Sequence, residues 1–359
     1  MNIVIIGLSI TSTWGNGHAT TYRSLLRAMS NRGHEILFLE RDVEWYASHR
    51  DMPEPDFCEL GLYQNLPELK NRFRQKIRHA DLIILGSYIP EGVAVASFIF
   101  QTSQSPVAFY DIDTPVTLTK LRSGNWEYLS PELVARFHLY LSFAGGPLLD
   151  QLKTEFGAQL ACPFYCTADL DAYYPQALRK RWDLGYLGTY SADRHRSLEE
   201  LLLTPATIHR NKPFIVAGSL YPSDICWPPN LVRIEHLPSA QHRAFYNRQR
   251  FTLNLTRDPM VKAGFSPSVR LFEAAACGAT IITDKWRGLK NFFEPGKEIL
   301  IATSVADVSR IIATMPESQR AEIGAAARQR FLKEHTPQHR AKELEAHAAD
   351  LLAGSELAA

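Results

Sequence analysis

The sequence predicts an α/β protein of two doubly wound domains, each a parallel β-sheet covered by helices. Two observations predict it. Short apolar runs alternate with helical patterns in both halves of the 359-residue chain, and these runs lack the polar alternation of half-exposed strands, so both faces are expected to be buried. The composition, 45% hydrophobic and 21% charged, is that of a folded chain long enough for about two domains.

The first half opens with an isoleucine-rich run, Asn2–Gly7, which we interpret as a buried strand because no basic residues precede it as they would in a secretory signal. A polar, glycine-rich loop follows. Apolar residues at i, i+3, i+4 and i+7 from Tyr22 to Met29 then predict one face of a helix that ends near Gly33. Further strands are expected at Glu35–Glu40, Leu82–Gly86 and Val107–Asp111.

The alternation resumes after residues 167–182, which carry Arg179-Lys180-Arg181 without apolar periodicity and are interpreted as a linker. The strands expected beyond it are Leu184–Leu187, Phe214–Ala217, Leu231–Glu235, Phe251–Leu255, Thr280–Thr283 and Glu298–Ile301. From Ser318 onwards the chain is expected to be helical. The predicted parts are therefore a domain over 1–166, a second domain over 183–330, and a C-terminal helix and tail over 331–359.

Charge, hydropathy and cysteine content exclude several classes of partner. Lys and Arg total 39 against 38 Asp and Glu, a formal charge of +1, so nothing favours binding to nucleic acid. The longest apolar stretches, such as Val93–Phe100, are far shorter than the ~20 residues of a membrane-spanning helix. The C-x-x-x-C of Cys162 and Cys166 lacks a second pair, so we expect free thiols, no metal site and a cytoplasmic protein.

The segment Gly264–Gly278 carries the clearest chemical signal. Ser266 is a good N-cap and Pro267 suits the first helical position, which predicts a helix over 267–277. The N–H groups of its first turn and its dipole favour a phosphate. Glu273 lies about 7.5 Å along the axis from Ser268, where a carboxylate can accept hydrogen bonds from ribose hydroxyls. Because its neighbours are apolar, this carboxylate is expected to be buried and to need a partner.

Several segments of the second half resemble the C-terminal domain of GT-B glycosyltransferases, in particular the group similar to the spore maturation protein CgeB. The sharpest is Arg270–Gly278, and the others are Trp182–Tyr190, Asn254–Asp258, Thr283-Asp284 and Phe292–Glu298. The resemblance implies two Rossmann-like domains facing across a cleft, with a last helix that packs back on the first domain. It also implies metal-independent sugar transfer from a nucleotide-sugar.

The resemblance assigns the donor mainly to the second domain, with Glu273 on the ribose. The turn Gly188-Thr189-Tyr190 and the helix N-terminus at Ser268 and Val269 would lie near the phosphates. Cationic side chains would neutralise the diphosphate leaving group in place of a metal. The candidates are Arg194, Arg257, Lys262 and Arg270. The donor would be a UDP-, GDP- or dTDP-linked sugar, and no further cofactor is implied.

One departure from the family pattern leaves alternatives open. Many retaining GT-B enzymes carry a second glutamate, which contacts the donor sugar, eight positions before the residue that matches Glu273, but Phe265 stands there in this chain. Retaining or inverting stereochemistry is therefore undecided. A catalytically inactive nucleotide-sugar-binding protein and a nucleotide-sugar epimerase of the same architecture remain alternatives.

Residues of the first domain are expected to bind the acceptor, whose identity as a small molecule, glycan or protein is undecided. Gly15, Asn16 and Gly17 match the acceptor-side loop that the resemblance implies. As a dinucleotide fingerprint this loop lacks the third glycine, although Glu40 at the end of the next strand suits an NAD-dependent oxidoreductase.

His18, Asp111 and Asp113 are the candidate catalytic residues. Both aspartates follow a strand at its carboxyl end, where doubly wound folds place ligands. A histidine oriented by an aspartate can deprotonate an acceptor hydroxyl, and some inverting GT-B enzymes use such a pair. The alternative is that His18 caps its helix and that the aspartates hold loop backbone.

Overall fold

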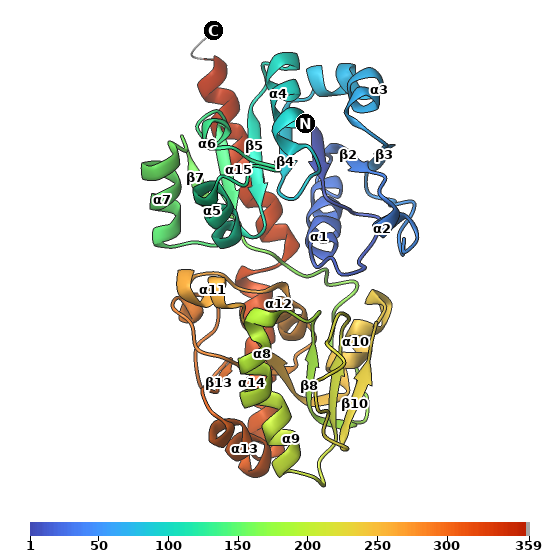
Figure 1. The fold of residues 1–359 in the computed structure, drawn as a ribbon, viewed down its shortest axis with the longest axis vertical. Coiled ribbons are helices and arrows are strands. Elements are labelled where there is room, and N and C mark those ends of the chain that lie inside the picture. Colours follow the sequence, from blue (N-terminus) through green and yellow to red (C-terminus); the bar gives the residue numbers. More distant parts are fainter. Residues whose placement is uncertain (357–359) are drawn as a thin grey trace. The chain divides into compact units, whose positions relative to one another are not determined.

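The computed structural model describes residues 1–356 and divides into two compact units. Unit 1 holds Met1–Cys166 together with the last helix, which begins at Pro337, and unit 2 holds Thr167–Thr336. Each unit is built on one parallel sheet with helices packed on it (Figure 1). The end of the predicted tail, residues 357–359, lies outside the described residues.

Unit 1 has a seven-stranded sheet in the order β3-β2-β1-β4-β5-β6-β7. The strands are β1 (Asn2–Gly7), β2 (Glu35–Arg41), β3 (Glu59–Tyr63), β4 (Leu82–Gly86), β5 (Val107–Asp111), β6 (Leu139–Ser142) and β7 (Ala161–Pro163). The sequence did not predict β3 and β7, the two edge strands of this sheet, or β6, which pairs with β5 and β7. The strand order reverses between β1 and β4, so the carboxyl ends of these strands border a ligand-binding crevice in folds of this kind.

The helices of unit 1 are α1 (His18–Ser30), α2 (Glu44–Ala47), α3 (Leu66–Arg78), α4 (Gly92–Thr102), α5 (Thr114–Ser123), α6 (Pro131–Val134), α7 (Pro147–Phe156) and α15 (Pro337–Glu356). The predicted apolar face of α1 is buried, from Tyr22 to Met29.

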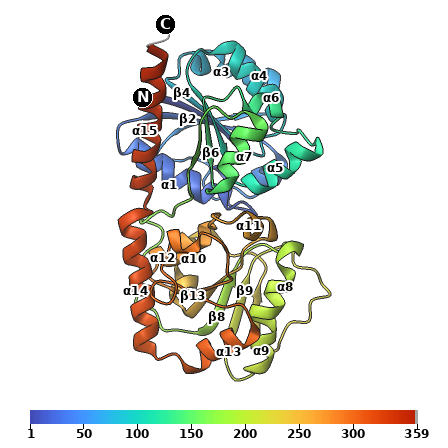
Figure 2. The ribbon, with the colours of Figure 1, turned by 90° about the vertical axis from the view of Figure 1, so that its left-hand side faces the viewer.

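Helix α15 lies along α1 (Figure 2). Arg32 and His34 both bond the Glu345 carboxylate, and these bonds lower its pKa to about 2.

Unit 2 has a six-stranded sheet in the order β10-β9-β8-β11-β12-β13. The strands are β8 (Trp182–Leu187), β9 (Phe214–Ala217), β10 (Leu231–Ile234), β11 (Gln249–Asn254), β12 (Thr280–Thr283) and β13 (Leu300–Ile301). All six predicted strands are present, with ends that differ by a few residues. The order reverses between β8 and β11, so the crevice of this unit borders Leu187 and Asn254.

The helices of unit 2 are α8 (His195–Leu198), α9 (Thr204–Ile208), α10 (Ser239–Asn247), α11 (Asp258–Ala263), α12 (Val269–Ala276), α13 (Val305–Thr314) and α14 (Glu317–Glu334). A π-helical stretch, Glu199–Leu203, joins α8 to α9. Pro205 is the second residue of α9, and because proline lacks an N–H it interrupts the α-helical hydrogen bonds there. Helix α14 packs on α12 and β12 (Figure 2).

The segment interpreted as a linker belongs to unit 2. Tyr173 is only 3% exposed, and the Asn247 amide accepts from the Gln176 N–H at 2.8 Å and donates to the Tyr174 carbonyl at 3.1 Å. Unit 2 ends at Thr336 rather than at 330, because the residue before Pro337 is disfavoured in helical geometry and the terminal helices break there.

Gly218 allows the carboxyl ends of β8 and β9 to approach each other. Gly218 has φ +150°, and a Cβ on it would overlap the carbonyl oxygen of Gly188. The Gly188 N–H in turn donates to the Ala217 carbonyl at 2.8 Å. A side chain at position 218 would therefore push apart the two strand ends that border the crevice.

Replacing Gly218 by alanine is expected to destabilise unit 2 by about 2 kcal/mol or more, since backbone strain and the overlap add. Gly296→Ala is the matched control, because Gly296 has φ +83° but no atom within 4 Å of an added Cβ. Urea unfolding measures both. Equal losses for the two variants would show that the close approach of β8 and β9 is unimportant for stability.

Candidate functional site

Arg270 joins the two strand ends at the switch point of unit 2. Its Nε–H donates to the carbonyl of Leu187, the last residue of β8, and its Nη1 donates to Asn254 Oδ1, at the end of β11, at 3.0 Å. The guanidinium also lies over the Tyr186 ring, 4.9 Å from the centroid, and against Gly188. A fixed positive charge therefore sits where a doubly wound sheet binds its ligand.

Helix α12 begins beside this arginine. It starts at Val269 rather than at Pro267, with Ser268 as an extended N-cap residue. The Ser268 hydroxyl does not cap the helix; it donates to Asn254 Oδ1 at 2.7 Å, so this one oxygen accepts from both Ser268 and Arg270. The first-turn N–H groups of a helix have no acceptor within it, and they favour an anion here.

Glu273 is buried in α12, with 4% of its surface exposed. Its Oε1 accepts from the Tyr173 hydroxyl at 3.0 Å and its Oε2 from the Tyr246 hydroxyl at 2.7 Å. Burial, then the charge of Glu273, holds the pKa of Tyr246 well above its ordinary value. A carboxylate offers about four lone-pair positions, so the two phenols leave about two for a ligand.

The turn after β8 holds the predicted residues Gly188, Thr189 and Tyr190 close to β9. The Tyr190 N–H donates to the Ser219 carbonyl at 2.9 Å, and the Tyr221 hydroxyl donates to the Gly188 carbonyl at 2.9 Å. Arg194 donates to the Thr189 carbonyl at 2.6 Å. Its Nε is buried without a partner among the described residues, which leaves one guanidinium donor available at this turn.

The other two predicted cations differ in their surroundings. Arg257 forms an ion pair with Asp193, with Nε 3.0 Å from Oδ2. Lys262 is exposed on α11. The structure therefore places Arg270, Arg194 and the α12 N-terminus together at the carboxyl edge of unit 2, whereas the Arg257 charge is already met by a carboxylate.

In unit 1 a buried carboxylate organises the loop after β1. Glu40 is fully buried, and it accepts hydrogen bonds from the hydroxyls of Ser9 and Thr11 and from the N–H groups of Ile10 and Thr11, at 2.6–3.1 Å. The idea that Glu40 binds the ribose of NAD is therefore wrong, because loop donors occupy this carboxylate. Asn16 completes the loop by donating to the carbonyls of Ser9 and Ser12, and Gly15 and Gly17 are exposed beside it.

The structure does not pair His18 with either aspartate. Asp111 is fully buried and accepts from the hydroxyls of Tyr140 and Thr117 and from the Asp113 N–H. Asp113 accepts from the Tyr88 hydroxyl at 2.8 Å. Neither aspartate therefore forms the predicted pair with His18. Both bond to neighbouring strands and loops, as the alternative interpretation expects for these aspartates.

His18 opens α1, and its ring packs 5.9 Å from that of Tyr88. Its Nδ1 is buried without a hydrogen-bonding partner among residues 1–356. Burial lowers the pKa of His18 to about 3, so the ring is neutral at physiological pH. The His18 side chain does not cap the helix, and its backbone N–H donates to Asn16 Oδ1 at 3.1 Å.

Three residues important to the edge of unit 2 were not among the predicted site residues: Asn254, Tyr173 and Tyr246. Asn254 could have been predicted, because it is a polar residue at the carboxyl end of a buried strand, as Asp111 is. Tyr173 and Tyr246 could not, since only the fold brings these phenols to Glu273.

Two further features of the described residues concern metal binding and membrane association. Within residues 1–356, no three or more His, Cys, Asp and Glu side chains gather in a way that could hold a metal ion. None of the helices in that part of the chain has both the length and the apolar character needed to cross a bilayer.

Comparison with known proteins identifies the fold. Residues 194–346 match the model of a family described as glycosyl transferase-like, and no curated protein sequence matches. Three solved structures cover 97–99% of this chain and 99–100% of their own. They are sucrose-phosphate synthase (tll1590) from Thermosynechococcus elongatus, at 12% identity and TM-score 0.68; Anabaena Alr3699/HepE in complex with UDP, at 15% and 0.71; and an alpha-glucosyltransferase in complex with UDP-glucose and DNA containing an abasic site, at 12% and 0.70.

These proteins are GT-B glycosyltransferases, and the fold of this chain is GT-B, as the sequence predicted. The family match lies almost wholly in unit 2 and includes α12 and the turn at Arg194.

Burial raises the pKa of Asp111 to about 6 from an ordinary value of 3.8. Between these values the unfolded chain releases a proton that the folded chain retains, so stability falls as the pH rises through this window. The loss is of the order of 3 kcal/mol at about 1.4 kcal/mol per pKa unit. Asp111→Asn is expected to remove this part of the pH dependence in urea unfolding from about pH 4 to about pH 7.

Asp56→Asn is the control, because the Asp56 side chain is 75% exposed in the same unit. If wild-type protein and Asp111→Asn show parallel stability curves over this pH range, Asp111 does not titrate as its burial requires.

Proposed function

We propose that this protein transfers a glycosyl group from a nucleoside-diphosphate sugar to an acceptor hydroxyl without a bound metal. The observation that carries the proposal is the glycosyl transferase-like match of residues 194–346 within a GT-B fold. Alr3699/HepE, which shares the fold, has been crystallised with UDP-glucose and with UDP, so UDP is our first choice of nucleotide, ahead of GDP and dTDP. We also propose, on the Arg270–Gly278 block, that the chain groups with the CgeB-like glycosyltransferases.

In the proposed reaction the acceptor oxygen bonds to the anomeric carbon of the donor sugar, and the bond from that carbon to the diphosphate oxygen breaks. The nucleoside diphosphate leaves with the electron pair, and the hydroxyl proton passes to a base. Negative charge grows on the leaving oxygen, so donors already aimed at it lower the barrier. We assign this work to the N–H groups at Ser268 and Val269, to the Gly188–Tyr190 turn and to the cations Arg194, Arg257, Lys262 and Arg270.

Arg270 is the best supported of these cations. Its guanidinium is held by the Leu187 carbonyl and by Asn254, so it loses little conformational freedom when an anion binds. It also lies in the first turn of α12, so its charge adds to that of the helix N-terminus. Glu273 stands farther along the same helix, and we assign its remaining lone pairs to the ribose hydroxyls.

We assign acceptor binding to unit 1, through the loop Gly15–Gly17, and proton transfer to His18 alone. Its neutral ring has a buried, unpartnered nitrogen, which can exchange a proton once an acceptor hydroxyl reaches it. The five cysteines are free thiols, which supports the cytoplasmic location that we propose.

A second candidate is a protein that binds nucleotide-sugar without transferring it. Phe265 favours it, because this residue replaces the carboxylate that many retaining enzymes place on the donor sugar, and its N–H is committed to the Arg287 carbonyl at 2.6 Å. Incubation with UDP-sugars separates the candidates. A transferase releases UDP faster when a mixture of candidate acceptors is added, and a binding protein releases none.

Glu273→Gln tests the nucleotide site. Wild-type protein is expected to melt at a higher temperature with UDP in the presence of a chelator, since a ligand of the folded state stabilises it. Glutamine keeps the size of the side chain and one acceptor oxygen for the tyrosines, so the variant is expected to fold and to lose most of the nucleotide-dependent shift.

Glu322→Gln, an exposed glutamate of α14, serves as the control and is expected to keep the full shift. If Glu273→Gln keeps the full nucleotide-dependent rise in melting temperature, Glu273 serves only to connect two tyrosines and does not bind the nucleotide. No shift with UDP, GDP or dTDP in wild-type protein would remove the proposed function.

His18→Ala is expected to lower turnover by about 100-fold or more, the usual contribution of a positioned base, while the KM for the donor changes little. His79→Ala, at an exposed histidine of the same unit, is the control. Because the pKa of His18 is about 3, its titration is expected to leave the rate flat from about pH 5 to about pH 8. Wild-type turnover in His18→Ala would assign the proton transfer to another group.

A further inference from the structure

A concave pocket of about 400 Å³ in unit 2 is lined mainly by positive charge. Its lining residues are Leu178, Arg179, Lys180, Arg181 and Arg248, so four of the five are cationic and none is acidic. The basic run at 179–181 therefore forms one wall of a cavity. None of its residues belongs to the proposed donor site or to the acceptor loop.

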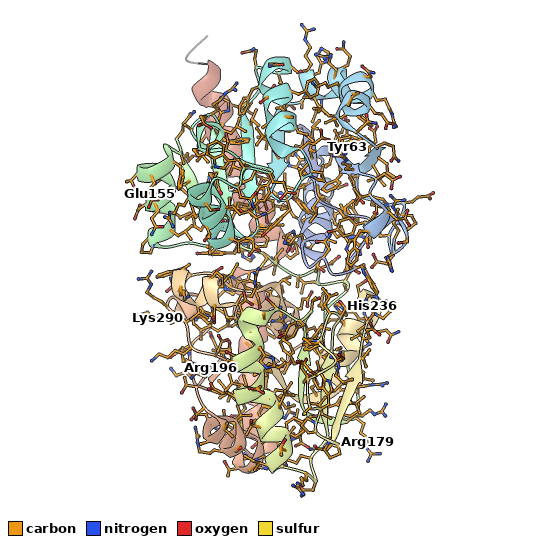
Figure 3. The ribbon with its side chains drawn as sticks, viewed as in Figure 1. Tyr63, Glu155, Arg179, Arg196, His236 and Lys290 are labelled. Carbon is orange, nitrogen blue, oxygen red and sulfur yellow. The ribbon has the colours of Figure 1, made fainter. Side chains whose placement is uncertain are left out.

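The pocket lies at the amino edge of the unit 2 sheet. Arg181 directly precedes β8 and Arg248 directly precedes β11, and the N–H groups of Arg181 and Trp182 donate to the Arg248 carbonyl at 2.8 and 3.2 Å. The α12 N-terminus and Arg270 lie at the carboxyl edge. Figure 3 labels Arg179 and His236, which follows the carboxyl end of β10, at opposite ends of this sheet. An anion in the pocket thus leaves the proposed donor site accessible.

The four cations stand out in the described part of the chain by their lack of carboxylate partners. Among the residues that the structure describes, none of the four forms an ion pair, whereas the nearby Arg250 and Arg320 both pair with Glu317. Surface arginines commonly find acidic neighbours, and a group of like charges without them is costly until an anion binds.

The surroundings of Lys180 disfavour its charged form. Burial, and after it the charge of Arg320, lowers its pKa to about 8, although Glu317 partly offsets the effect. Its ammonium group donates to the Asn247 carbonyl at 2.8 Å, which holds it in place.

The wall of the pocket is preformed. The Asn247 side chain bonds the backbone of Tyr174 and Gln176, and Lys180 bonds the Asn247 carbonyl, so α10 holds the segment that carries the basic run. Little ordering of the backbone is then needed on binding, which favours affinity for a small ligand. A volume of about 400 Å³ lies at the lower end of the range for small-molecule sites.

We propose that this pocket is a second anion site, which binds a small phosphorylated ligand through Arg179, Lys180, Arg181 and Arg248. Guanidinium groups match the geometry of phosphate oxygens through paired N–H donors, and a lysine adds a point charge. The site is separate from the nucleotide site in residues and position, so it stands whether or not the proposed function does.

Calorimetric titration with inorganic phosphate, at constant ionic strength against chloride, tests the proposal. Wild-type protein is expected to bind one phosphate per chain saturably. The double variant Arg179→Ala/Arg181→Ala is expected to bind at least tenfold more weakly. Both side chains are exposed, and within residues 1–356 neither guanidinium donates a hydrogen bond, so the variant is expected to fold.

The matched control is Arg196→Ala/Arg310→Ala, which removes the same charge from exposed, ion-paired arginines of unit 2. Its phosphate affinity is expected to stay within twofold of wild type, and the UDP-dependent melting shift is expected to be unchanged in all three proteins. Equal loss in both double variants would overturn the proposal, because it would show a general effect of net charge. So would the lack of saturable phosphate binding to wild-type protein.

Vesicles separate a free phosphorylated ligand from a lipid headgroup. Binding to phosphatidylglycerol vesicles, but not to phosphatidylcholine vesicles or to free phosphate, would overturn the small-ligand proposal in favour of a membrane surface. Phosphate binding that vesicles of either composition do not reproduce would support it.

Discussion

The carboxylate of Glu273 joins three stretches of unit 2 that are far apart in the sequence. Tyr173 reaches it from the segment that follows unit 1, Tyr246 reaches it from α10, and Glu273 itself belongs to α12. A buried charge is tolerated only when hydrogen bonds replace the lost water, and the two phenols supply them. Since α12 also carries Arg270 and follows Ser268, the position of the edge to which we assign phosphate binding depends on this carboxylate.

Unit 1 uses the same device at the corresponding edge of its own sheet. Glu40, at the end of β2, accepts four hydrogen bonds from the loop after β1 and so shapes the chain that leads to Asn16 and His18. The loop is held from inside, which leaves its exposed glycines available for a ligand. In both units, therefore, the sequence suggests a ligand-binding role for a glutamate whose buried carboxylate accepts hydrogen bonds from the protein's own donors.

The distribution of charge in unit 2 is more informative than the net charge of +1. At the carboxyl edge, Arg270 and Arg194 are held by backbone carbonyls, and Arg257 is paired with Asp193. At the amino edge, four cations line a pocket that has no acidic residue among its described lining residues. A balanced total therefore conceals two local excesses of positive charge, and the physical reason is that burial and spacing, rather than the sum, set the local potential.

Most of the strand pattern and the GT-B fold could be predicted from the sequence. The strands follow from a local rule, because buried parallel strands need continuous apolar runs, whereas the GT-B fold was expected from the resemblance of the second half to that family. The edge strands β3 and β7 could not be predicted, since their residues become strands only through pairing, and β6, which lies between β5 and β7, was not predicted either. The helix at the end of the chain was expected, but its break at Pro337 marks where the chain changes units.

The site residues divide in the same way. The sequence by itself determined which side chains are available at each strand end and helix start, and thus the candidates Arg270, Ser268, His18 and Asp111. Only the tertiary structure decided their partners. Asp111 accepts hydrogen bonds from Tyr140 and Thr117 and none from His18, and two distant tyrosines donate to Glu273. The reason is physical, because a buried polar group bonds whichever donor the packing brings within about 3 Å, and sequence separation does not limit that choice.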